Sequence, residues 1–162
     1  ATFVDMDAPA HMRQRSMVEP FFTQQHVKTL EPYIQKTVDS LLDNMVAAGC
    51  ANPVDLVEKI ALPVPSYIIY TILGVPFEDL EYLAQQNAIR TNGSATAREA
   101  ASANQELLDY LAKLADMRAA EPKDDIISSL VVQMEAGNLE KSDVVQIAFL
   151  LLVAGNATLV NM

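Results

Sequence analysis

The sequence is poor in the residues that build metal centres and disulfide frameworks. It has one cysteine, Cys50, and two histidines, His11 and His26, in 162 residues. A single thiol excludes an internal disulfide and any zinc or iron–sulfur site built from several cysteines. Two histidines are too few for a histidine-based metal cluster, so no metal ligand is expected within the chain.

Positive charge is also scarce. The 11 Lys and Arg residues are outnumbered by 21 Asp and Glu residues, which gives a net charge of −10 and a pI near 4.5. A surface this acidic argues against binding to nucleic acid, because contact with phosphates needs basic side chains. No nucleic-acid partner is therefore expected.

A clear membrane-spanning segment is missing as well. Residues 144–162 carry no charge and are long enough to span a bilayer. However, Asn156 and Asn161 would be costly in lipid, and no Lys/Arg cluster flanks the segment. We predict a buried helix here and a soluble protein, cytoplasmic or mitochondrial, with its targeting segment not present in this chain. A transmembrane protein is only the third interpretation.

The hydrophobic pattern predicts an all-α fold with little or no strand, because apolar residues recur at steps of three and four. Asp7 is expected to cap the first helix, Thr23 the second and Asp124 or Asp125 the sixth. Residues 53–58 are compatible with a short strand or with the entry to a helix. The predicted helices cover Pro9–Val18, Thr23 to Gly49, Pro65–Leu73, a helix from Pro76 with Phe77, Leu80 and Leu83 inward, Ala97–Ala119, Asp124 or Asp125 to Gly137, and Glu140 onward.

The links between these helices are short, which favours one α-helical unit over two domains. The chain opens without an initiator Met and stops inside an apolar run. We therefore expect residues 1–162 to be a single incomplete domain, an internal fragment truncated at both ends.

One pair of residues in the first helix has the chemistry of an anion site. His11 and Arg15 are four residues apart, so they share one helix face. Side by side, an imidazole and a guanidinium offer paired donors to carboxylates or phosphates. The alternative is an ordinary solvated helix face, which the neighbouring Arg13 supports.

The last helix carries a second pattern. Side chains become smaller along one face, from Ile147 through Leu151 to Ala154, with Gly155 beside them and Thr158 beyond. Small residues next to polar ones in an apolar helix indicate either close helix packing or a ligand pressed against the backbone. Both alternatives remain open at this stage.

The chain from Phe3 to Met162 resembles the cytochrome P450 family, in which both the His/Arg pair and the small-residue pattern of the last helix recur in this order. The stretch DAPAHMRQRSMVEPFF is similar to the family's C-helix signature, D-x-P-x-H-x-x-x-R, with Asp7, Pro9, His11 and Arg15 in place. The stretch VAGNAT is similar to the family's I-helix motif, A/G-G-x-D/E-T. Ala157 occupies the acidic position of that motif, which is a departure from it.

The resemblance is strongest to the fungal nitric oxide reductase P450s, through FVDMD, ALPVPSYIIYT, LEYLAQQNAIRTNGSATAREA and QIAFLLLVAGNAT. It implies the helical portion of the cytochrome P450 fold and haem b as cofactor. It also implies reduction of nitric oxide to nitrous oxide with NADH or NADPH as the direct electron donor, and no separate reductase protein. Ala157 in place of the acidic residue agrees with this reaction. The family's monooxygenases use an acid–alcohol pair to deliver protons for O–O bond scission, and a reductase that never splits O₂ does not need the acid.

The resemblance also implies roles for individual residues. His11 and Arg15 would grip the haem propionates, and Ala154, Gly155 and Thr158 would line the distal side of the haem. Asp5 would orient a basic residue upstream of the chain. Arg90 would help to receive the nicotinamide dinucleotide, the alternative being an exposed arginine at a helix end. The candidate catalytic residues are Thr158 and Asn156, and the candidate cofactor-binding residues are His11, Arg15, Ala154, Gly155, Arg90 and Asp5.

The family's thiolate ligand to haem iron lies in an F-x-x-G-x-x-x-C segment that this sequence lacks. We interpret Cys50 as a bystander thiol, and we expect the chain alone to be inactive. Two other functions stay open. One is a P450 monooxygenase that hydroxylates a small organic substrate, and the other is a non-catalytic acidic helical module that binds a partner protein.

Overall fold

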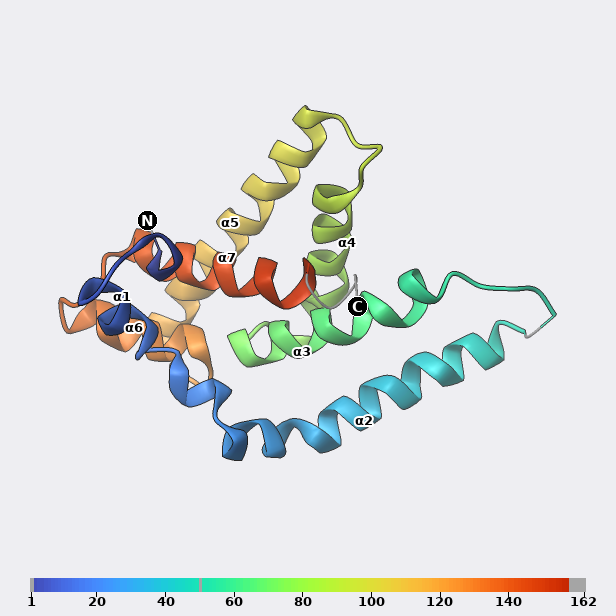
Figure 1. The fold of residues 1–162 in the computed structure, drawn as a ribbon, viewed down its shortest axis with the longest axis horizontal. Coiled ribbons are helices and arrows are strands. Elements are labelled where there is room, and N and C mark those ends of the chain that lie inside the picture. The colour runs from blue at the N-terminus through green and yellow to red at the C-terminus, as the bar shows by residue number, and fades with distance from the viewer. Residues whose placement is uncertain (1, 50, 158–162) are drawn as a thin grey trace.

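The computed structural model describes residues 2–49 and 51–157, and within them every regular element is a helix. The all-α prediction is therefore confirmed (Figure 1). The elements are η1 (Phe3–Asp5), α1 (Ala10–Arg15), η2 (Glu19–Phe22), α2 (Gln24–Ala47), η3 (Val57–Ala61), α3 (Pro63–Leu73), η4 (Phe77–Asp79), α4 (Leu80–Thr91), α5 (Ala97–Ala120), α6 (Ile126–Glu135) and α7 (Lys141–Ala157).

Several helix ends lie where their capping residues predict. The Thr23 hydroxyl accepts a hydrogen bond from the His26 backbone N–H at 3.2 Å, and Asp125 caps α6 in the same way. Gly49 follows α2 with a φ of +99°, a conformation that suits glycine. Helix α5 begins with a capping box between Thr96 and Glu99, which the sequence analysis did not identify.

Other expectations about the elements were wrong. The first helix ends at Arg15 rather than Val18, and Asp7 supplies a backbone carbonyl to His11 N–H rather than a side-chain cap. Phe77 is 82% exposed because it lies in the η4 turn, before the register of α4 begins. Leu80 and Leu83 are buried as predicted. The strand alternative for residues 53–58 is excluded, since this segment leads into the π-helix η3.

The core lies where α3 packs against α7 and where α5 and α6 close over the other side of α7. Helix α4 pairs along its length with α5, whereas α2 runs along the edge of the molecule and buries only Thr37 (Figure 1). The largest fully buried side chains are Tyr70, Leu73, Leu83, Leu107, Leu111, Leu114, Ile126, Ile127, Leu130, Val131, Ile147 and Leu152. No helix of the described part is long and apolar enough to cross a membrane.

A buried ion pair joins three helices. Arg118 on α5 lies 2.7 Å from Asp125 (Nε to Oδ2), and both side chains are 5% exposed. A second nitrogen of Arg118 donates to the carbonyl oxygen of Gly74, which ends α3 with a φ of +98°. The other Asp125 oxygen accepts from the N–H of Ser128 at 2.7 Å. Because the two charges share these extra hydrogen bonds, the cost of burying them is offset.

Removing one member of this pair leaves the other charge buried without a partner. We expect Arg118→Met or Asp125→Ala to lower the free energy of unfolding by about 3–5 kcal/mol, as measured by urea denaturation. The matched control is Lys141→Met, which breaks the exposed 2.6 Å pair with Asp116 and should cost less than about 1 kcal/mol. Equal losses in the three variants would contradict the structural role of Arg118 and Asp125.

Candidate functional site

Helix α7, which carries the predicted site residues Ala154, Gly155 and Asn156, is covered unevenly. Val144, Ile147, Ala148, Leu152 and Asn156 are buried in the core. In contrast, Gln146 and Ala154 are exposed, and Leu150 between them is half-buried. The prediction of a helix buried on all sides concerns the longer protein of which this chain is expected to be a piece, and it stays a prediction. Helix α7 has a packing side toward α3, α5 and α6, and an open side at Gln146, Leu150 and Ala154.

Gly155 lies on the packing side. A Cβ built on Gly155 would lie 2.9 Å from both Cβ and Cγ1 of Ile69 on α3, closer than side chains tolerate. The absence of a side chain therefore lets α3 and α7 approach each other. This contact gives Gly155 a packing role, whereas its predicted role beside a cofactor stays a prediction.

Asn156 also faces α3, where it is 1% exposed. Its Oδ1 accepts from the Ser66 hydroxyl at 2.6 Å, and its Nδ2 donates to the Leu152 carbonyl at 3.0 Å. The side chain is thus held by α3 and by its own helix. Ser66 and Tyr70 are four residues apart on α3 and so share one helix face, and this spacing was the signal in the sequence that could have predicted the cluster.

Tyr70 completes this buried polar cluster. Burial raises the pKa of the Tyr70 phenol to about 12, although the nearby Asn156 and Ser66 side chains act in the opposite direction. The phenol hydroxyl donates to the Leu83 carbonyl oxygen at 3.4 Å. The phenol therefore stays protonated over the whole physiological range. The cluster fixes the end of α7 against α3 without introducing a charge.

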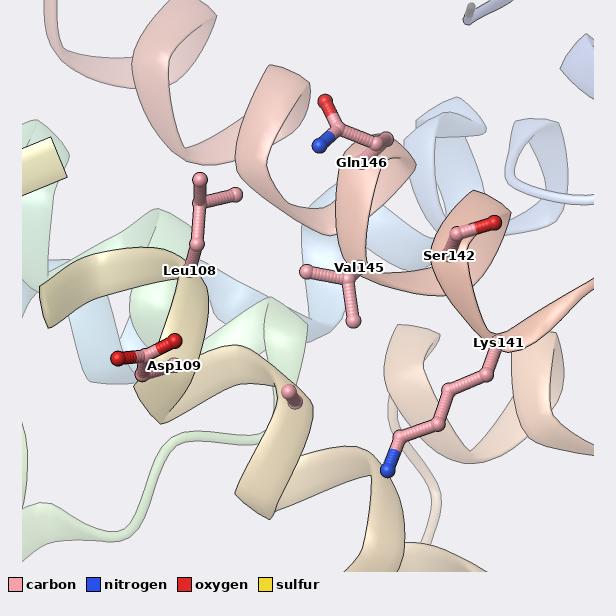
Figure 2. A pocket seen from close by; sticks show the side chains of 7 residues that line it. Leu108, Asp109, Lys141, Ser142, Val145 and Gln146 are labelled. Atoms are coloured by element: carbon pink, nitrogen blue, oxygen red, sulfur yellow. The ribbon is translucent and has the colours of Figure 1, made fainter. Parts of the chain in front are cut away.

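Two adjoining grooves follow the open side of α7. One, of about 210 Å³, is lined by Thr2 and Asp5 of the N-terminal segment and by Gln146, Phe149, Leu150 and Val153. The other, of about 340 Å³, lies between α5 and the start of α7 and is also lined by Gln146 (Figure 2). Figure 2 shows the residues that line this groove, with Leu108 and Asp109 on α5 and Lys141, Ser142, Val145 and Gln146 on α7. Gln146 lines both grooves, so they meet at this residue.

His11 of the predicted anion pair is linked to the first of these grooves through η1. The imidazole of His11 contacts the ring of Phe3 in η1, with ring centroids 6.1 Å apart, and η1 also supplies Asp5 to the first groove. Arg15 is exposed one turn further along α1. Within residues 2–49 and 51–157, the side chains of His11 and Arg15 have no hydrogen-bond or ion-pair partner, so their side-chain donors are available.

Arg90 is not the exposed helix-end residue considered above. It is half-buried, and its Nε and Nη2 donate to Asn87 Oδ1 at 3.2 and 2.9 Å. Burial lowers the pKa of the guanidinium. No carboxylate of the described chain pairs with it, so its charge remains available to an anion.

The structure thus places Asp5 at a groove along α7 and brings His11 into contact with Phe3 of the same short helix. Ala154 lies further along α7, exposed to solvent. Gly155 and Asn156 lie toward α3 instead, and Arg90 lies on α4. Thr158, the central catalytic candidate, is outside the described residues, and so is Cys50. No group of three His, Cys, Asp or Glu side chains in the described part could hold a metal ion.

The raised pKa of Tyr70 predicts a specific loss of stability at high pH. Between pH 10 and 12 the unfolded chain releases this phenolic proton while the folded chain keeps it, so stability falls as pH rises, by up to about 2–3 kcal/mol. Tyr70→Phe should make this part of the loss disappear in denaturation curves recorded across that range. A variant with an unchanged pH dependence would contradict the buried, protonated phenol.

Comparison with known proteins identifies the family. No family model matches the chain. Over 162 residues the chain is 75% identical to cytochrome P450 55A3 of Fusarium lichenicola, an alignment that covers 99% of this chain and 40% of that protein. It is 42% identical to cytochrome P450 GfsF of Streptomyces halstedii, with 99% of this chain and 38% of that protein covered.

Solved structures that resemble this chain belong to the same family. The crystal structure of GfsF matches with a TM-score of 0.94 at 40% identity, over 99% of this chain and 40% of that chain. Cytochrome P450 MoxA from Nonomuraea recticatena matches with a TM-score of 0.89 at 34% identity, over 98% and 39% of the two chains. The chain spans about 40% of the length of these relatives. On these similarities the chain belongs to the cytochrome P450 family of oxidoreductases.

Proposed function

We propose that this chain is part of a haem-thiolate nitric oxide reductase that takes electrons directly from NADH or NADPH. The observation that carries the proposal is in the sequence, where the stretch VAGNAT keeps Thr158 of the family motif but has Ala157 at its acidic position. A reductase that never splits O₂ does not need that acid. The 75% identity to cytochrome P450 55A3 supports the cytochrome P450 part of this assignment.

The residues present fit haem. His11 and Arg15 are donors without partners in the described chain, and two haem propionates need such donors to avoid an uncompensated burial of charge. The open side of α7 offers apolar surface with a small residue at Ala154. When bound, haem supplies the iron at which nitric oxide is reduced, and its thiolate ligand comes from outside this chain.

The other residues take supporting roles in the proposal. Arg90 attracts the anionic dinucleotide to an otherwise acidic protein, and Asp5 orients a basic residue from the segment before it. Asn156 acts as a positioning residue, because its amide is committed to Ser66 and Leu152. Thr158 supplies a hydroxyl that can donate and accept a proton near the reacting nitric oxide.

A second candidate is a monooxygenase acting on a small organic substrate. It is favoured by relatives whose names describe such activities, including a vitamin D3 dihydroxylase of Streptomyces griseolus at 35% identity and a nocardicin C N-oxygenase of Nocardia uniformis at 36%. The residue at position 157 separates the two, since the monooxygenase motif places an acid there.

Removing the anion pair tests the proposed haem contact. In the full-length enzyme, His11→Ala combined with Arg15→Ala should lower haem occupancy, measured as the ratio of Soret to protein absorbance. Each charge-assisted hydrogen bond contributes at most about 1.5–3 kcal/mol. Arg13→Ala, which changes a neighbouring exposed arginine on the same helix, is the control. Unchanged haem binding in the double variant would remove His11 and Arg15 from the site.

Changing the end of α7 tests the reaction itself. Thr158→Val keeps the side-chain shape and removes the hydroxyl, so NADH-driven nitrous oxide formation should fall about 10²-fold or more, with haem content unchanged. Ala157→Asp should restore the acid–alcohol pair and weaken NADH use, because it adds negative charge where the dinucleotide approaches. If Thr158→Val is fully active and the parent enzyme hydroxylates organic substrates efficiently, the monooxygenase assignment is correct instead.

A further inference from the structure

The loop between α4 and α5 contains a reactive arrangement that the proposed function does not use. Asn92 and Gly93 form the only Asn-Gly pair in the sequence. Asn92 is exposed and lies just beyond the last residue of α4, with an extended backbone (φ −70°, ψ 112°). Its amide side chain is therefore outside the helix and accessible to solvent.

The neighbouring backbone nitrogen is available as a nucleophile. Gly93 N–H has no hydrogen-bond partner in the described chain, and a Cβ built on Gly93 would meet nothing within 4 Å. Glycine also has the widest conformational freedom of any residue, so the nitrogen can turn toward the preceding side chain. Asn44, Asn87, Asn104 and Asn156 lie in helices, where the following N–H belongs to the helix ladder.

The side-chain carbonyl of Asn92 is already polarised. Its Oδ1 accepts a hydrogen bond from the Ser94 N–H at 2.9 Å. A donor in this position stabilises negative charge that develops on the oxygen when a nucleophile adds to the carbon, as in an oxyanion hole. The electrophile is thus activated, and the nucleophile beside it is free.

We propose that Asn92 is a site of spontaneous deamidation by attack of its own chain. The Gly93 nitrogen bonds to Cγ of Asn92, and the side-chain nitrogen leaves as ammonia, taking the Gly93 proton with it. Water then opens the resulting five-membered imide at either carbonyl. The products are aspartate, or isoaspartate with one extra carbon in the main chain, and no oxidant or reductant is consumed.

The reaction changes a sensitive place in the fold. It adds a carboxylate at the C-terminal end of α4, where the helix dipole disfavours negative charge. The new charge is two residues from Arg90, so it also reduces the positive potential there. The isoaspartate form lengthens the loop that connects α4 to α5.

The test is a time course of the folded full-length protein at mildly alkaline pH, followed by peptide mass spectrometry. The peptide with Asn92 should gain the mass of an amide-to-acid change and yield both isoaspartate and aspartate. Asn138 is the internal control, because its Nδ2 is held by Gln133 at 2.9 Å and Leu139 follows it. Asn92 should convert well before Asn138.

Gly93→Ala is the matched variant, since the space around Gly93 accepts a methyl group. It should slow conversion at Asn92 strongly, because the side chain hinders ring closure. The proposal is overturned if Asn92 reacts no faster than Asn138, if aspartate is the sole product, or if Gly93→Ala deamidates at the parent rate.

Discussion

The arrangement of helices in this protein depends on one buried ion pair. Arg118 and Asp125 lie almost fully out of solvent, and between them they bind the end of α3, the side of α5 and the start of α6. Gly74 makes this possible, because a side chain at its Cα would overlap the Asp125 carboxylate. Charges that are buried with complete hydrogen bonding impose a specific geometry, and α7 packs onto the surface formed by these same three helices.

That packing divides α7 into two sides with different tasks. Gly155 and Asn156 hold the helix against α3, through close contact with Ile69 and a hydrogen bond from Ser66. Ala154 lies next to them in sequence but is exposed. Under the proposed function, the rigid side fixes the position of the helix and the open side meets the cofactor and the small gaseous substrate. Under that same proposal, the motif in the sequence combines residues for packing with residues for chemistry.

The sequence predicted features that depend on local physics. Thr23, Asp125 and Gly49 mark helix ends because caps need particular side chains or a positive φ, and the long helices followed from their apolar spacing. The burial of Arg90 and the outward Phe77 could not be predicted, since both depend on how separate elements meet. The same holds for Asn156, whose neighbour Ser66 is 90 residues away in the chain.

The central claim, that adjacent residues of α7 serve packing and ligand binding separately, is tested most directly by a pair of substitutions in the haem-loaded protein. Nitric oxide affinity, read from the shift of the Soret band, and the free energy of unfolding are measured for Gly155→Ala and Ala154→Val. Gly155→Ala should lose about 1–3 kcal/mol of stability through overpacking against Ile69. Ala154→Val should weaken nitric oxide binding with stability nearly unchanged. The reverse pattern, or equal effects on both quantities, would contradict the division of α7 into a packing side and a ligand side.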